Sequence, residues 1–249
     1  MRDHLASTIN VDLIKDYLRR YHGIDVFSYK DDFLRRRVRA RMIATKCRDF
    51  MEYLRLLRTD PHEVKRFLDD MSINVSQFFR DPHIWEKVKT LVFEELIEEK
   101  RRTGRRTIKI WSAGCCRGEE PYTISIILHE ILGAEINNFF ITIIATDIDE
   151  DALESAKEGI YPRLSLTSVP LPLLSKYFMP VGNGLYAVKD HVKSLVKFMV
   201  HNLLKDPYPL FLDVIVCRNV FIYFSHEAQQ RVLERFHRSL NNNGYLILG

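Results

Sequence analysis

The chain has 249 residues, 46% of them hydrophobic and 28% charged, which excludes an intrinsically disordered protein and suits one large or two small domains. Its net charge of +4 hides an asymmetry, because residues 1–60 alone hold 14 Lys+Arg against 9 Asp+Glu. The sequence has no evident signal peptide, bilayer-length apolar run or C-x-x-C pair, so we expect a cytoplasmic protein without a metal site.

The first part of the chain predicts helices. Four segments carry apolar residues at helical spacing, at 11–21, 31–45, 50–57 and 61–71. In the second segment Leu34, Val38 and Met42 recur every four residues and predict a buried face. Five arginines cover the rest of that helix: Arg35, Arg36, Arg37, Arg39 and Arg41. We expect a helical N-terminal domain over residues 1–82.

A polar and aromatic stretch at 74–82 interrupts this pattern, and Pro82 begins a further helix that runs to about residue 99. Residues 101–106 are charged and contain a glycine. We therefore expect a linker helix and hinge over residues 83–106, between the helical domain and a second domain over 107–249.

Residues 108–128 predict a strand, a tight loop and a helix. The apolar run ends at Gly114, a polar turn contains Gly118, and Glu119 and Glu120 precede Pro121 at the start of the next helix. A strand that leads into a glycine loop and a helix opens the nucleotide site of many α/β folds. A plain tight turn between strand and helix is the alternative interpretation.

Strands and helices alternate after this point. Strands are predicted at 141–145, 185–188, 195–200, 213–217 and 245–248, and helices at 150–158 and 226–240, whereas 160–178 is broken by prolines and predicted to be irregular. This order predicts a doubly wound, mostly parallel α/β sheet. Because the sequence stops directly after a strand, we expect the domain to be C-terminally truncated.

Polar residues follow several of these strands, at the edge where such sheets bind ligands. Asp147 could accept hydrogen bonds from ribose hydroxyls or cap the next helix. Asn202 and Asn219 could bind a ligand or satisfy loop backbone. Cys115, Cys116 and Cys217 suit packing better than nucleophilic catalysis.

Taken together, the motifs resemble the CheR family of chemotaxis receptor glutamate O-methyltransferases. The motifs are NVSQFFRD (74–81), WSAGCCRGEEPYTI (111–124), ATDID (145–149), NLL (202–204), CRNVFIYF (217–224) and NGYLILG (243–249). The resemblance covers nearly the whole chain. It implies a Rossmann-like methyltransferase sheet with a helical N-terminal domain and a small antiparallel β-subdomain inserted at about 160–200. The loop at 115–117 departs from the small residues and hydroxyl common in the family.

The resemblance also implies the cofactor and its site. S-adenosylmethionine would be the cofactor and S-adenosylhomocysteine the product. The implied cofactor-binding residues are Asn74, Ser76, Arg80, Gly114, Glu120, Asp147, Asn202, Leu203, Arg218 and Asn219. Arg80 and Tyr223 would lie near the transferring methyl group as catalytic residues. A glutamate acceptor is already ionised at pH 7, with a pKa of about 4.3, so the reaction needs no general base.

The implied partner is the cytoplasmic helical bundle of a chemoreceptor, whose glutamate side chains would become methyl esters during adaptation. The five arginines between Arg35 and Arg41 would bind this acidic substrate, although an ordinary solvated face is the alternative. The turn at 180–184 is short, as in family members that work without a receptor C-terminal pentapeptide, so we expect independence from that tether. Neither nucleic acid nor membrane insertion is expected.

Two rival hypotheses remain at this stage. The basic N-terminal region also suits a nucleic-acid methyltransferase. However, Cys217-Arg218-Asn219-Val220 stands where amino-group methylases carry an Asn/Asp-Pro-Pro-aromatic motif, and no proline precedes Cys217 as a cytosine C5 enzyme requires. A non-catalytic module that binds the cofactor and a partner is the second rival, and Arg80 and Tyr223 argue against it.

Overall fold

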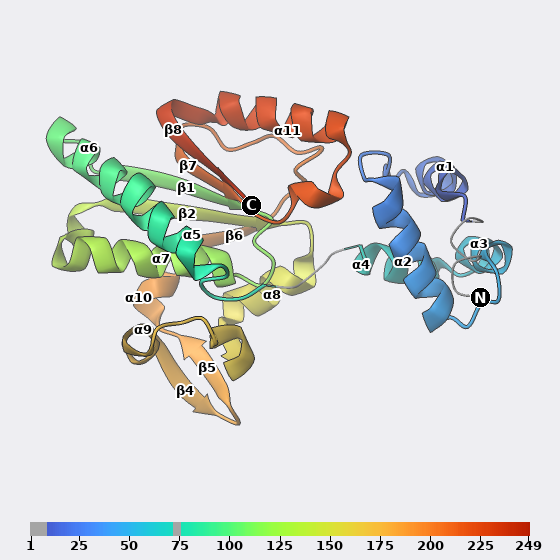
Figure 1. Cartoon of the computed structure of the whole chain (residues 1–249), viewed down its shortest axis with the longest axis horizontal. Coiled ribbons are helices and arrows are strands. Elements are labelled where there is room, and N and C mark those ends of the chain that lie inside the picture. Colours follow the sequence, from blue (N-terminus) through green and yellow to red (C-terminus); the bar gives the residue numbers. More distant parts are fainter. Residues whose placement is uncertain (1–8, 72–75) are drawn as a thin grey trace. The chain divides into compact units, whose positions relative to one another are not determined.

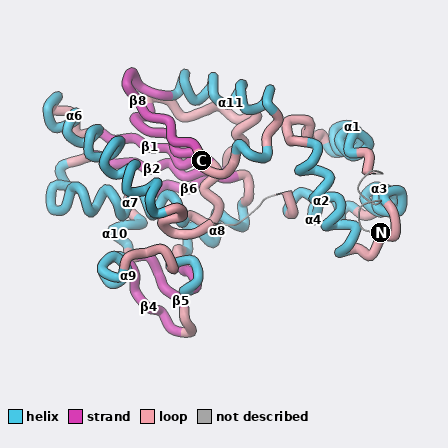
Figure 2. Tube along the Cα trace, viewed as in Figure 1, coloured by secondary structure: helices cyan, strands magenta, loops and turns pink. Residues whose placement is uncertain are grey.

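The computed structural model describes residues 9–71 and 76–249 (Figures 1 and 2). The chain divides into two compact units. The helical unit comprises Met1–Ile73 together with Phe221–Val232, and the sheet unit comprises Asn74–Val220 together with Leu233–Gly249. One of the two units is therefore completed by a segment from late in the chain.

The helical unit is built from amphipathic helices whose ends are capped by side chains. Its helices are α1 (Val11–His22), α2 (Asp31–Ala44), α3 (Phe50–Thr59) and α4 (Pro61–Asp69), with the 3-10 turn η4 (Phe221–Tyr223) and the first part of α11 (His226–Ser239). Asp49 accepts a hydrogen bond from the Glu52 backbone N–H at 2.8 Å, as an N-cap does. Leu34, Val38 and Met42 are buried, which confirms the predicted inner face of α2.

The sheet unit contains a five-stranded sheet with the order β6-β2-β1-β7-β8. Its strands are β1 (Thr107–Ala113), β2 (Phe140–Asp147), β6 (Val196–Val200), β7 (Leu212–Cys217) and β8 (Leu240–Leu248). Each neighbouring pair in the described residues is parallel, which confirms the predicted sheet type. The order reverses direction at β1, so the carboxyl ends of β1 and β7 flank the switch point where such sheets bind ligands.

Helices cover both faces of this sheet (Figure 1). They are α5 (Pro82–Val88), the π-helical turn η1 (Lys89–Glu94), α6 (Glu95–Thr103), α7 (Glu119–Leu132) with the 3-10 turn η2 (Gly133–Asn138), α8 (Glu150–Glu158) and α11. Ile110 packs in one apolar cluster with Ile124 and Leu128 of α7. Its neighbour Trp111 faces the other way, where its ring contacts Phe236 of α11 at 5.3 Å between centroids.

A small antiparallel sheet with the order β3-β5-β4 lies between α8 and β6 in the chain (Figure 2). Its elements are β3 (Ile160–Pro162), the 3-10 turn η3 (Arg163–Leu166), α9 (Leu171–Tyr177), β4 (Phe178–Gly182), β5 (Leu185–Val188) and α10 (Asp190–Lys193). The prediction that 160–178 is irregular was therefore wrong. Its prolines lie where they are tolerated, Pro162 at the end of β3 and Pro172 in the first turn of α9.

The C-terminal strand also begins earlier than predicted. β8 starts at Leu240, which pairs with Leu212, and the register shifts before Tyr245 pairs with Val214. The Asn241 side chain donates a hydrogen bond to the Asp213 carboxylate at 3.0 Å, so a polar contact holds this irregular stretch beside β7. No helix in the described part of the chain is long and apolar enough to cross a membrane.

Candidate functional site

The loop after β1 is tied to the end of β2. The backbone N–H groups of Gly114 and Cys115 both donate to the Thr146 carbonyl at 2.8 Å. Gly114 has a φ of +81°, and a Cβ atom there would lie 2.5 Å from Val220 Cγ2. Glycine is therefore required at this position both by the backbone conformation and by the close approach of the segment after β7.

Asp147 anchors the same loop. One carboxylate oxygen accepts the Cys116 N–H at 2.8 Å and the other accepts the Asp149 N–H at 3.1 Å. The N-cap of α8 is Asp149, whose side chain accepts the Ala152 N–H, so the alternative role of Asp147 as that cap does not apply. Burial raises the pKa of Asp147, while the backbone donors Asp149 and Cys116 lower it. Each oxygen keeps lone pairs that could accept a ribose hydroxyl.

Glu120 lies beneath this loop in the first turn of α7. It accepts a hydrogen bond from the Ser112 hydroxyl of β1 at 2.8 Å. Burial raises its pKa to about 7, although the Ser112 hydrogen bond and the positive charges of Arg218 and Arg80 oppose the shift. The site thus holds a carboxyl group that a nearby cation would ionise.

Arg80 lies in a tight turn between buried phenylalanines and α5. Phe78 and Phe79 are buried, and the Phe79 N–H donates to the Thr123 hydroxyl of α7 at 3.1 Å. Phe79 and Asp81 both have positive φ, +52° and +58°, which is rare for a bulky aromatic residue. The turn therefore stores backbone strain on both sides of Arg80, as residues at functional sites do.

Arg218 joins this turn to the end of β7. Its guanidinium donates to the Arg80 carbonyl at 3.0 Å and to the Asp81 carboxylate at 2.7 Å. Its Nε is buried and has no hydrogen-bond partner among the described residues. An orphaned buried donor of this kind suits a bound ligand that brings an acceptor.

Asn202, Leu203 and Asn219 occupy loops at the same edge of the sheet. Asn202 accepts the Leu204 N–H at 2.9 Å with its side-chain oxygen, so the predicted backbone-satisfying role is present. The Leu203 carbonyl accepts from the Tyr208 hydroxyl and from Arg235. Asn219 adopts a left-handed conformation with φ of +59°. Asn74 lies outside the described residues.

Four side chains of this site were not predicted. Ser112 and Asp81 stand inside the quoted motifs WSAG and FFRD, and their positions beside Glu120 and Arg80 are the signal that could have identified them. Trp85 supports Arg218, whose Cζ lies 5.4 Å from the ring centroid. Glu119 is 2% exposed, hydrogen-bonds Ser76, and has one oxygen without a partner among the described residues.

Tyr223 and the arginines of α2 belong to the helical unit. The Tyr223 ring packs against Phe33, with centroids 4.9 Å apart. Arg41 forms a bidentate ion pair with the buried carboxylate of Glu63 at 2.7 and 2.8 Å. Arg35 pairs with Asp32 at 2.8 Å, whereas Arg36 is exposed. The five predicted substrate-binding arginines therefore differ in environment.

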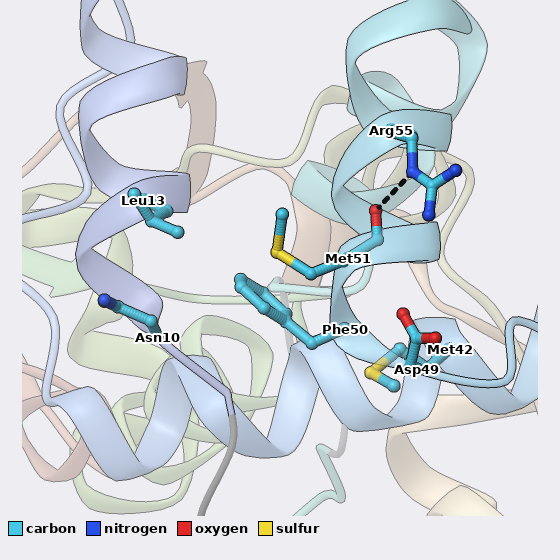
Figure 3. Close-up of a pocket in the computed structure, with 7 residues that line it drawn as sticks. All are labelled: Asn10, Leu13, Met42, Asp49, Phe50, Met51 and Arg55. Atoms are coloured by element: carbon cyan, nitrogen blue, oxygen red, sulfur yellow. Dashed lines mark hydrogen bonds between the residues drawn. The ribbon is translucent and has the colours of Figure 1, made fainter.

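The same unit has a surface hollow between α1 and α3 (Figure 3). The side chains that line it are Asn10, Leu13, Met42, Asp49, Phe50, Met51 and Arg55. Arg55 is held along α3 by a hydrogen bond from its Nε to the Met51 carbonyl at 3.3 Å. The hollow contains no predicted site residue from the described part of the chain.

Two family models match the chain in succession. The all-alpha domain of CheR methyltransferases matches residues 9–72, and the SAM-binding domain of CheR methyltransferases matches residues 74–249. The site described above lies within the second match, and its loop, carboxylates and orphaned donor suit a nucleoside-containing cation.

Relatives that match most of this chain support the same assignment. A chemotaxis protein methyltransferase of Borreliella burgdorferi is 31% identical over 97% of this chain and 89% of that protein. The chemotaxis protein methyltransferase of Escherichia coli is 33% identical over 100% of this chain and 86% of that protein. An uncharacterized 104.1 kDa protein of Rhodobacter capsulatus is 32% identical over 91% of this chain, which spans only 23% of that protein. With both domains matched in order, the chain belongs to the CheR methyltransferase family.

Proposed function

We propose that the protein is a protein-glutamate O-methyltransferase that converts glutamate side chains on chemoreceptor cytoplasmic helices into methyl esters. The observation that carries the proposal is the cluster at the switch point of the sheet, where Glu120, Asp147, Arg80 and Arg218 converge within a SAM-binding domain. The names of the relatives support a chemotaxis substrate.

S-adenosylmethionine, when bound, supplies a methyl group activated by a sulfonium sulfur. Asp147 would hold the ribose, and Glu120 would provide negative charge to a cationic ligand. The remaining predicted binding residues, Asn74, Ser76, Gly114, Asn202, Leu203, Arg218 and Asn219, would complete the site. Gly114 would keep the loop after β1 in its conformation, since a Cβ atom there would lie only 2.5 Å from Val220 Cγ2.

The acceptor chemistry needs no general base, because a glutamate carboxylate is already ionised at pH 7. Transfer forms one C–O bond and breaks one C–S bond, whose electron pair stays on sulfur. A tightly bound cation on the acceptor would stabilise the reactant more than the transition state, since opposite charges neutralise as the bond forms. Arg80 and Tyr223 would therefore orient the carboxylate, and positioning alone can supply roughly 7–11 kcal/mol in favourable cases.

Thiol nucleophiles do not suit this site. Burial raises the pKa of Cys116 to about 12, and burial also raises the pKa of Cys115 and of Cys217. Each of these thiols is therefore protonated near neutral pH, which disfavours a mechanism through a covalent cysteine intermediate.

The helical unit, which contains α2, would dock on the receptor bundle through the arginines of that helix. Glutamate-rich receptor helices present the opposite charge, so encounter would be faster at low salt. We infer that docking does not require a receptor C-terminal pentapeptide, because the turn at 180–184 between β4 and β5 is short.

The test is methyl transfer from radiolabelled S-adenosylmethionine to a panel of chemoreceptor cytoplasmic fragments, followed by mild base. Release of volatile methanol is expected, since carboxyl methyl esters hydrolyse readily in base. Base-stable label in protein or RNA would contradict the glutamate assignment. Binding of the cofactor without any label on the panel would favour a non-catalytic binding module.

A further inference from the structure

The buried side chain of Arg218 has three partners among the described residues. Its side chain is 5% exposed, and its guanidinium contacts the Arg80 carbonyl, the Asp81 carboxylate and the face of Trp85. The Arg80 carbonyl accepts a hydrogen bond and the Trp85 ring attracts the cation, but both groups are uncharged. Asp81 is the contact that carries a full negative charge. The ion pair with Asp81 measures 2.7 Å.

The backbone conformation of Asp81 places its carboxylate against the Arg218 guanidinium. Asp81 has φ of +58° and ψ of +69° immediately before α5, and its side chain is 48% exposed. It makes no side-chain capping bond to the helix that follows. Aspartate and asparagine tolerate the left-handed region better than other residues with side chains. The strained position therefore serves the contact with Arg218 rather than the start of α5.

The charge of Arg218 matters to the site because it acts on Glu120 together with Arg80. A buried guanidinium at this edge of the sheet repels a cationic ligand unless an anionic partner offsets its charge, and Asp81 is the carboxylate that contacts Arg218. A buried guanidinium that loses its ion-pair partner is also costly to the fold. The ion pair with Asp81 both offsets the charge of Arg218 at the site and gives the buried guanidinium a partner.

We propose that Asp81 is a positioning residue for the methyl-transfer site, which fixes the guanidinium of Arg218 and cancels its charge so that a cationic cofactor is accepted. The proposal rests on the proposed use of S-adenosylmethionine. It assigns Asp81 no contact with the cofactor, since Asp81 acts through Arg218.

The effect of the Asp81 charge can be measured by comparing the affinities of two ligands that have nearly the same shape but differ in charge. S-adenosylmethionine carries a positive sulfur and S-adenosylhomocysteine a neutral one. We expect Asp81→Asn to weaken S-adenosylmethionine binding roughly two- to tenfold more than S-adenosylhomocysteine binding, from one uncompensated charge at an intermediate dielectric. Asparagine keeps the size of the side chain and tolerates the left-handed backbone, so the change removes mainly charge.

Calorimetric titration of both ligands into the wild type, Asp81→Asn, Asp81→Glu and Asp190→Asn gives the measurement. Asp190 is an exposed aspartate of α10 and serves as the matched control. Asp81→Glu restores the charge, so the wild-type ratio of the two affinities should return even if both affinities fall.

Equal weakening of both ligands by Asp81→Asn, or no change in either, would overturn the positioning role. A shifted ratio in Asp190→Asn of the same size would overturn it as well, because any lost negative charge would then suffice. If the wild type binds neither ligand, the result contradicts the proposed function itself. That outcome is distinct from an unchanged affinity ratio in Asp81→Asn, which contradicts only the role of Asp81.

Discussion

Glu120 is the residue whose charge the site must control. Its carboxyl group accepts a hydrogen bond from the Ser112 hydroxyl, and burial raises its pKa to about 7. Near neutral pH the protein without ligand therefore holds Glu120 partly protonated. Binding of a cation shifts it towards the ionised form, so ligand binding should release protons.

Cofactor affinity should consequently depend on pH through Glu120. If, as proposed, the ionised form of Glu120 favours the cationic cofactor, S-adenosylmethionine affinity should rise between about pH 6 and pH 8 and level off above. Glu120→Gln should bind roughly tenfold more weakly at pH 8 and lose this pH dependence, since one pKa unit corresponds to a factor of ten. Calorimetric titration across the pH range measures both. An unchanged pH profile in the variant would contradict the assignment.

The raised pKa of Glu120 also affects the stability of the fold, which should fall with rising pH whereas cofactor affinity should rise. The folded-state pKa of Glu120 lies above its ordinary value of 4.5, so the unfolded chain releases this proton first as pH rises. Stability from this group is full below about pH 4.5 and is lost as pH rises through 7. Without ligand, Glu120→Gln should therefore raise the melting temperature at pH 8 and change it little at pH 5.

The proposed orienting role of Tyr223 leads to a prediction about its hydroxyl group. If it orients the acceptor carboxylate, Tyr223→Phe should lower kcat roughly ten- to a hundredfold, the worth of one hydrogen bond to a charged group, and leave cofactor affinity near that of the wild type. Tyr21→Phe, at an exposed position of α1, is the control. Equal losses of turnover and cofactor affinity would remove the orienting role.

At the scale of the element, α2 combines a structural and an exposed set of arginines. Arg41 reaches the fully buried Glu63, whose carboxylate also accepts the Tyr53 hydroxyl at 3.1 Å, and it contacts Asp70 at 3.2 Å. Arg37 lies over the Phe33 ring at 5.3 Å, while Arg36 is exposed. A charge reversal at Arg41 would therefore test folding before it tests substrate binding.

Arg41→Met should destabilise the protein by about 3–5 kcal/mol, because it removes the bidentate partner of the buried Glu63 charge and leaves the Tyr53 hydroxyl and the more distant Arg66, 3.9 Å away. Urea unfolding measures the loss. In the double variant Arg41→Met/Glu63→Met no charge remains to be buried, so much of the stability should return. Wild-type stability in the single variant would show that the ion pair contributes nothing to the fold.

On the scale of the whole molecule, the charge asymmetry leads to a prediction about the electrostatic steering of the proposed acidic partner. Arg36→Glu/Arg37→Glu should lower receptor methylation roughly tenfold at low salt, with normal cofactor binding, and the deficit should shrink as salt rises. Arg20→Glu/Arg48→Glu makes the same change in net charge outside α2, at side chains that are 73% and 89% exposed. Methylation kinetics of both double variants at two ionic strengths give the measurement. Equal effects of the two variants would favour an influence of net charge over a specific docking face on α2.

Much of the fold follows from local pattern. Helical spacing predicted α1 to α4, and apolar runs predicted the strands of the parallel sheet, whose ends in turn predicted the places of Asp147 and Arg218. Contacts between distant residues were not predictable in this way. Arg218 and Asp81 are 137 positions apart, and Arg41 and Glu63 are 22 apart, so their pairing depends on the tertiary structure.

The late segment Phe221–Val232, which completes the helical unit, constrains how the protein is made. Phe33 leaves the ribosome long before Tyr223, the ring against which it packs, has been translated. Strand β7 precedes that segment, so the nascent chain must carry an incomplete helical unit through synthesis of most of the sheet. The helical unit is therefore completed only after most of the sheet has been translated, and a chaperone that binds apolar surface could bind the incomplete unit during that interval.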